Sequence, residues 1–316
     1  PLSALLAIAF LIAGLIVLVL DLGKPDRLIV AMTTYNFKSI FSWNIFLYSG
    51  FAVVLAVYMW TMLDREANRF SKYAGTFAFG WRIILTTGTG SIFGFLVARE
   101  AYATAILAPL IIVMSLLYGT AVYYLILKII SKFHNTYISD DIVKNLRKLT
   151  IMFLFANLYF LFLYHITNMY IAKHLDYEIF ILSSGGIYTI AFWVGQLFVG
   201  IIIPIILMNS SRLSLEYSLI LSSVLILIGS FIAMYVIIIG GQAYPLTIFP
   251  DHVIIESSFY DNVVHSYIPS VYELGLGLGG VALALIIVLI GIANFKFLPT
   301  IIKPANVIPN KDDAAD

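Results

Sequence analysis

The chain has 316 residues, of which 61% are hydrophobic and only 11% are charged, and its mean hydropathy is +0.99. Soluble domains carry about 25% charged residues, so a soluble enzyme, a nucleic-acid-binding protein and a disordered protein are excluded, and a polytopic membrane protein remains. The net charge is +1 and there is no Cys, so these residues offer no thiolate for a disulfide, a zinc site or an iron–sulfur cluster.

Eight apolar segments are long enough to cross a bilayer as α-helices, which takes about 20 apolar residues each. Their apolar runs are continuous, whereas the strands of a membrane barrel are shorter and alternate in polarity. In chain order the segments are 3–20, 40–63, 80–98, 104–131, 148–172, 179–208, 214–240 and 274–295. We therefore predict an all-α polytopic membrane protein with eight transmembrane helices. They form a single transmembrane domain over residues 1–300, followed by a polar tail at 301–316.

The distribution of Lys and Arg predicts the orientation of these helices. Alternate links carry five basic residues on one side and thirteen on the other, and the side rich in Lys and Arg is cytoplasmic by the positive-inside rule. The links at 21–39, 99–103, 173–178 and 241–273 then face outward, and the C-terminus lies in the cytoplasm. We expect a multi-pass protein of the cell membrane whose outer links hold nine acidic residues.

No link is long enough to form a catalytic domain. The longest, 241–273, has 33 residues, and domains below about 40 residues rarely fold alone. Redox or hydrolytic chemistry would therefore need other chains, which favours an anchor subunit, a transporter or a channel.

Polar side chains at membrane depth are costly and mark candidate sites. They are Asp21, Asn44, Ser91, Arg99, Glu100, Asn157, His165, Asn168, Gln196 and Glu273. Several also have a structural interpretation: Asp21 as a capping pair with Lys24 or Arg27, Arg99 with Glu100 as a juxtamembrane pair, and His165, Asn157 and Gln196 as interhelical hydrogen-bond partners.

Haem and metal sites are disfavoured by the histidines. A b-type haem commonly needs two axial His residues from facing helices, and only His165 lies at membrane depth. There is neither an H-E-x-x-H motif nor a His pair at i, i+4. We expect no haem and no metal held by this chain.

Several motifs together resemble the NrfD/polysulfide-reductase family of quinone-reactive membrane subunits. They are DLGKPDR (21–27), YNFKSIFSWNIFLY (35–48), TTGTGSIFGFLVAREAYATAILAPLIIVMSLLYGTA (86–121), LFVGIIIPIILM (197–208), GGQAYPL (240–246) and YIPSVYELGLGLGGVALAL (267–285). The last two are similar to the ten-helix branch, which includes hydrogenase membrane subunits and those of alternative complex III. The chain begins at Pro1 inside what would be a later helix of that branch, so we expect its first two helices to be missing.

The resemblance implies two packed four-helix bundles, with extra helices in the full protein. It implies a respiratory subunit, not catalytic on its own, that binds a quinone, menaquinone-like or other, near the outer face. Electrons would pass to or from a docked iron–sulfur (ferredoxin-like) subunit and a catalytic subunit on that face.

The Asp of the family's DLG motif corresponds to Asp21, which we expect to accept a proton from quinol. The quinone-binding residues that we expect with it are Arg27, Ser91, Arg99, Glu100 and His165. A proton path would use Asn157, His165, Gln196 and Glu273. A secondary transporter or proton channel subunit is the alternative, which Pro109 and Pro204 inside helices favour and the absence of a convincing inverted repeat opposes.

Overall fold

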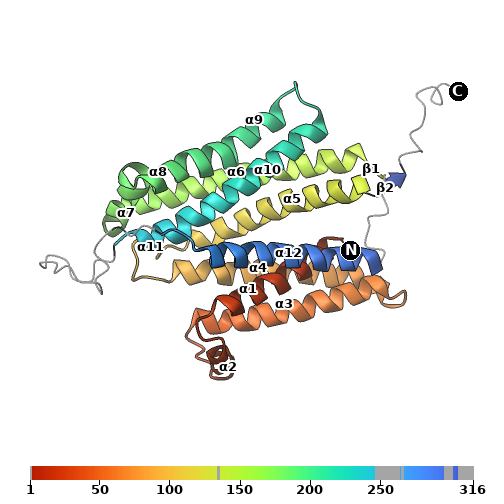
Figure 1. The fold of residues 1–316 in the computed structure, drawn as a ribbon, viewed down its shortest axis with the longest axis horizontal. Coiled ribbons are helices and arrows are strands. Elements are labelled where there is room, and N and C mark those ends of the chain that lie inside the picture. The colour runs from red at the N-terminus through yellow and green to blue at the C-terminus, as the bar shows by residue number, and fades with distance from the viewer. Residues whose placement is uncertain (1, 134–135, 246–263, 265–266, 295–301, 305–316) are drawn as a thin grey trace, which may run out of the picture.

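The computed structural model describes residues 2–133, 136–245, 264, 267–294 and 302–304. Long helices run roughly side by side through it, with short elements at their two ends (Figure 1). The α-helices are α1 (Leu2–Asp21), α2 (Asp26–Thr33), α3 (Ile40–Leu63), α4 (Ser71–Gly94), α5 (Leu107–Phe133), α6 (Asp140–Tyr170), α7 (Leu175–Ile179), α8 (Ile187–Ile190), α9 (Ile203–Asn209), α10 (Leu215–Met234), α11 (Gly241–Ala243) and α12 (Val271–Asn294).

Other helical geometries interrupt or extend this series. The 3₁₀ turns are η1 (Ala67–Phe70) and η2 (Ala172–His174), and the π-helical segments are η3 (Phe180–Ser184), η4 (Ala191–Ile202) and η5 (Tyr235–Gly240). Strands β1 (Thr136–Ile138) and β2 (Ile302–Pro304) pair antiparallel, with Tyr137 opposite Lys303. Through this pairing, the start of the predicted tail lies against the link between α5 and α6. The rest of the tail lies outside the described residues.

The all-α membrane fold is confirmed. Seven helical stretches within the described residues are long and apolar enough to cross a membrane: 2–21, 40–63, 107–133, 140–170, 187–209, 215–243 and 271–294. The eighth predicted segment, 80–98, corresponds to α4, which begins nine residues earlier and ends at Gly94. Arg82 and the polar run 86–91 (TTGTGS) interrupt its apolar stretch, yet it packs along α3 and α5.

The long helices form two groups, which can be followed in Figure 1. The first group contains α1, α3, α4 and α12, and the second contains α5, α6, the 187–209 stretch and α10; α4 packs on α5 and joins them. The main core runs through the second group and takes in the first half of α1. Large apolar side chains remain exposed along the helix flanks, as expected for surfaces that face lipid.

Glycines allow the helices of the second group to approach closely. A Cβ on Gly229 of α10 would lie 2.1 Å from the Cα of Gly200 in η4, and one on Gly195 would lie 2.6 Å from Ile232. Small residues at such crossings let backbones touch in membrane proteins. The contact holds η4, and the side chains it carries, tightly against α10.

Gly229→Ala should therefore destabilise the protein. The new methyl group would meet backbone rather than a flexible side chain, and overpacking of this kind costs about 1–3 kcal/mol. We expect a lower thermal unfolding midpoint of the detergent-purified protein. The matched control is Gly119→Ala on α5, where no atom lies within 4 Å of the added Cβ. Equal midpoints for the two variants would show that the crossing is not tightly packed.

Candidate functional site

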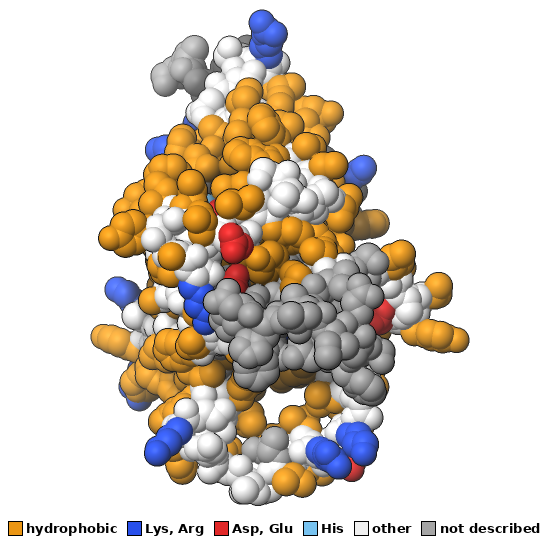
Figure 2. Space-filling view, turned by 90° about the vertical axis from the view of Figure 1, so that its left-hand side faces the viewer, with side chains coloured by type: hydrophobic (Ala, Val, Ile, Leu, Met, Phe, Trp, Pro, Cys, Tyr) orange, Lys and Arg blue, Asp and Glu red, His pale blue; other side chains and the backbone are white. Residues whose placement is uncertain are grey.

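The predicted outer links gather at one end of the helices. The end of α1, α2, the 95–106 loop, α7 and α11 all lie at the left in Figure 1. Figure 2 views this end, where apolar side chains cover the flanks and the charged side chains are few and scattered. We call it the outer end, in keeping with the predicted orientation.

The 95–106 loop connects the two helix groups at the outer end. Arg99 Nη1 donates to the carbonyl of Gln242 at 2.9 Å and contacts that of Tyr244 at 3.3 Å. The buried Tyr102 hydroxyl reaches the carbonyls of Ile237 and Ile238 at 3.0 and 3.2 Å. Both carbonyls belong to the π-helical segment η5, where the regular i→i−4 pattern is interrupted. The loop thus forms hydrogen bonds with the backbone of this distorted helical segment.

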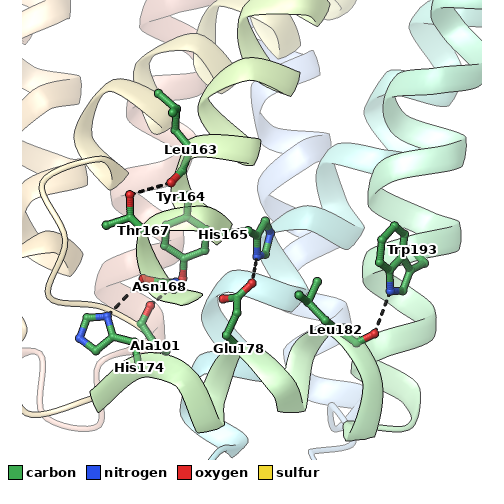
Figure 3. Close-up of polar contacts among 10 residues, drawn as sticks. All are labelled: Ala101, Leu163, Tyr164, His165, Thr167, Asn168, His174, Glu178, Leu182 and Trp193. Carbon is green, nitrogen blue, oxygen red and sulfur yellow. Dashed lines mark hydrogen bonds and ion pairs between the residues drawn. The ribbon is translucent and has the colours of Figure 1, made fainter. Parts of the chain in front are cut away.

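A buried acid–base pair lies where α6 meets α7. Glu178 of α7 is 1% exposed, and its Oε1 contacts the Nδ1 of His165 on α6 (Figure 3). The His165 side chain is 13% exposed, and its ring packs edge-on against Phe192 of η4 with centroids 4.6 Å apart. Glu178 Oε2 has no hydrogen-bond partner among the described residues.

Further polar contacts continue from this pair toward the outer end of α6. Asn168, which is fully buried, contacts the Nδ1 of His174 through its Oδ1 at 3.2 Å. The Tyr164 hydroxyl donates to the carbonyl of Ala101 at 2.7 Å, and this ties α6 to the 95–106 loop (Figure 3). Each of these groups makes a polar contact, whereas Asn168 Nδ2 has no hydrogen-bond partner among the described residues.

Five aromatic rings form a chain beside these contacts. Neighbouring centroids are 5.4–5.7 Å apart, within the range of favourable aromatic pairs. In order along the chain the rings are Tyr177, Tyr244, Phe180, Tyr188 and Tyr235. They connect α7 and η3 to α8 and η5, and so fix the geometry around Glu178.

Burial alters the titration of several groups outside the spans. It raises the pKa of Tyr102 to about 12, opposed by Arg99, and the pKa of Tyr244 to about 12, with Glu100 and Asp176 adding to the effect. Burial also raises the pKa of Glu100, and together with Lys173 it lowers the pKa of His174. At neutral pH the tyrosines are therefore hydrogen-bond donors, and His174 is uncharged.

A groove lies at the outer end of the first helix group. It has a volume of about 460 Å³ and is lined by Phe37, Lys38, Ser39, Ile40, Trp43 and Phe95, and we call it the α3–α4 groove. Ser39 is the N-cap of α3 and makes no side-chain capping bond, so amide groups of the first helical turn keep their capacity to donate. Trp43 Nε1 donates to the Phe37 carbonyl at 2.9 Å, which fixes the turn that precedes the helix.

The sequence comparison identifies the family. Residues 2–245 match the polysulphide reductase NrfD family. The chain belongs to this family. The resemblance seen in the motifs is thereby confirmed, whereas the ten-helix branch stays a prediction.

Two curated relatives of this NrfD-family chain carry functional names. One is the Hdr-like menaquinol oxidoreductase integral membrane subunit of Archaeoglobus fulgidus, 27% identical over 304 residues that cover 94% of this chain and 75% of the relative. The other is a selenate reductase subunit of Mesobacillus selenatarsenatis, 23% identical over 240 residues that cover 64% of this chain and 56% of the relative. The chain thus spans little more than half the length of the second relative.

The predicted quinone-binding residues of this NrfD-family protein fall into separate places at the outer end. Asp21 and Arg27 are exposed, at the end of α1 and in α2. Ser91 lies in the last turn of α4, one turn before Phe95 of the groove, whereas Arg99 and Glu100 lie in the 95–106 loop. His165 lies in the second helix group. They share the outer end but are divided between the two helix groups and the loop that joins them.

The predicted proton-path residues are also separated. Asn157 of α6 and Gln196 of η4 are buried, and Gln196 Oε1 has no hydrogen-bond partner among the described residues. Glu273 is exposed at the start of α12, in the other helix group. Its carboxylate accepts from the Ser270 amide at 2.6 Å while Ser270 Oγ accepts from the Glu273 amide at 3.2 Å, which is a capping box.

None of the residues that line the α3–α4 groove was among the predicted site residues, and neither was the buried Glu178. Little in the sequence indicated that Glu178 is buried, because an acidic residue in a predicted outer link is expected to be exposed to solvent. Glu178 is nevertheless followed directly by the apolar run 179–182, and that position could have indicated burial. His252, His265 and the acids of the 251–261 stretch lie outside the described residues. Among the residues described, no group of three or more His, Asp or Glu side chains is placed to hold a metal ion.

Proposed function

We propose that this chain is the quinone-reactive membrane subunit of a multi-subunit oxidoreductase. Quinol or quinone reacts near the outer end and exchanges electrons with an iron–sulfur subunit docked there, beside a catalytic subunit. Family membership supports this proposal, as do the names of both relatives, which describe subunits of a menaquinol oxidoreductase and a selenate reductase.

The α3–α4 groove is the observation that carries the proposal. Its volume lies within the usual range for small-molecule sites, about 300–1,000 Å³. Phe37, Trp43 and Phe95 offer faces for a quinone ring, whereas Lys38 and the first amides of α3 offer donors to its oxygens. The groove lies at the end of a helix flanked by lipid-facing side chains, so an isoprenoid tail can remain in the bilayer.

The chain's own part in the reaction is to bind, orient and exchange protons. Within this proposal Asp21 accepts a proton from quinol, Arg27 and Arg99 balance the negative charge, and Ser91, Glu100 and His165 complete the polar surroundings. Quinol oxidation also releases two electrons. Because the 316 residues include no Cys to hold an iron–sulfur cluster, electrons pass to clusters held by the partner subunits.

Photolabelling of the intact complex tests the location. A quinone carrying an aryl azide, illuminated in the purified complex, should label peptides that contain Phe37, Trp43 or Phe95, and excess unlabelled quinol should suppress the labelling. In the same preparation, quinol should reduce the iron–sulfur centres. Labelling confined to the opposite end, for example around η1, would contradict an outer quinone site.

A proton-translocating function is the second candidate. It is favoured by Asn157 and Gln196, two buried amides deep within the second helix group, one of them with an unpartnered oxygen. Uptake of protons by vesicles that hold the complex in the absence of quinol would favour a transporter. Proton movement that depends on quinol would favour a redox-coupled path.

A further inference from the structure

Glu178 is a buried carboxylate with half of its hydrogen-bonding capacity unused. It is 1% exposed, Oε1 contacts His165, and Oε2 has no partner among the described residues. Taking a carboxylate out of water costs several kcal/mol, and a carboxylate kept only for structure is expected to have both oxygens satisfied. A free oxygen beside an imidazole is instead the arrangement in which a proton can be added to and removed from the pair.

The surroundings restrict where that proton can go. The titratable groups that interact with Glu178 from the elements packed on it are Tyr164 of α6, His174 of η2 and Tyr177 of α7. Behind them, Lys173 acts on His174, and Tyr102 of the 95–106 loop acts on Tyr164 and Tyr177. From η4 the ring of Phe192 covers His165 and carries no titratable group. Burial holds the pKa of both Tyr102 and Tyr177 well above the ordinary value, so neither competes for the proton near neutral pH.

A polar route leads from the pair toward the outer end. Asn168 lies one helical turn beyond His165 on α6, and it contacts the buried His174. The preceding residue, Lys173, is exposed and its ammonium group reaches the Val97 carbonyl at 3.4 Å. Polar groups thus continue from the buried pair to the water-exposed surface within the last turn of α6 and η2.

The local backbone also departs from regular helix around the pair. Immediately after α7 the chain forms π-helical η3, then Gly186 at φ +58°, and then η4, which carries Phe192. π-helical geometry within α-helices is frequently found at functional sites. Here Glu178 of α7 and Phe192 of η4 both contact His165 of α6.

We propose that Glu178 and His165 form a proton-exchange site, which takes up a proton during quinol turnover and releases it toward the outer end. The inference rests on the proposed function. The step is a proton transfer only: an O–H bond forms on Glu178, or an N–H bond on His165, as the proton arrives, and it breaks as the proton leaves. The two electrons of quinol pass to the partner subunits.

The test uses the intact complex and compares Glu178→Gln with Asp176→Asn. Both variants remove one carboxylate from α7, but Asp176 is exposed. In the unmutated complex, quinol-dependent turnover should fall as the pH is lowered, because the Glu178–His165 pair becomes protonated and can no longer accept a proton. Glu178→Gln should reduce turnover about 10²-fold, the usual scale for a lost proton acceptor, and should shift this acid limb of the pH profile. Asp176→Asn should retain both the rate and the limb, and Glu178→Asp should restore part of the rate.

His165→Asn provides an independent measurement if Glu178→Gln fails to assemble. It retains a hydrogen-bond donor for Glu178 but removes the titrating ring, so the acid limb should shift or disappear. An unchanged pH profile in an assembled Glu178→Gln or His165→Asn complex would overturn the pair as a proton-exchange site. Failure of the unmutated complex to oxidise quinol or reduce quinone would instead reject the proposed function itself.

Discussion

Asp21→Asn should lower quinol turnover about 10²-fold while leaving the protein folded. The substitution preserves the size of the side chain and removes the proposed proton acceptor, whose loss is expected to cost about 10²–10⁴-fold. A structural role for this carboxylate is hard to find. Asp21 is the last residue of α1, it is exposed, and no basic residue lies in the last turn. A negative charge there opposes the helix dipole by about 0.3–1 kcal/mol, so its removal should not destabilise α1.

The control for this measurement is Asp26→Asn. Asp26 is an exposed acid five residues further along, in the first turn of α2, where a negative charge favours the helix dipole. Its loss should leave turnover within about twofold and should slightly destabilise α2. If Asp21→Asn and Asp26→Asn turned over quinol at the same rate, Asp21 would not be the proton acceptor.

Hydropathy predicted the membrane-crossing segments because apolar length is what a bilayer selects. It did not predict where the helices themselves end. Helix α6 begins at Asp140 rather than near 148, because its first two turns are polar and extend beyond the apolar segment. There Arg147 donates to the Met208 carbonyl, and the Tyr137 hydroxyl bonds Asp140 at 2.6 Å. Helix α4 ends at Gly94, where the backbone of Thr104 comes so close that a Cβ would lie 2.8 Å from its carbonyl oxygen.

The candidate site was predictable only in part. The DLGKPDR and YNFKSIFSWNIFLY motifs led to the correct family, but the residues that line the α3–α4 groove were not predicted as site residues. The Glu178–His165 pair depends on α7 folding back onto α6, a tertiary contact that no local pattern specifies. The π-helical segments have the same apolar composition as regular helix, so they leave no signal in the sequence.

Trp43→Ala should weaken quinol binding at the α3–α4 groove. The centroid of the Trp43 ring lies 6.1 Å from that of Phe37 and 6.4 Å from that of Phe46, and its Nε1 donates a hydrogen bond to the Phe37 carbonyl. Truncation removes a stacking surface worth about 0.5–1.5 kcal/mol and also releases the turn before α3. We expect KM for quinol to rise about tenfold, which corresponds to about 1.4 kcal/mol, with a smaller change in kcat.

Trp60→Ala on the same helix is the matched control for this prediction. Trp60 is 61% exposed and lies 17 residues further along α3, about 25 Å away at 1.5 Å per residue, toward the opposite end. Both variants remove an indole from a membrane-facing helix, so a general effect on insertion or lipid packing should change both proteins equally. A rise in KM confined to Trp43→Ala would follow from a quinone ring held in the groove, since only that indole lines it. Equal KM values in the two variants would mean that quinol binds elsewhere on the outer end.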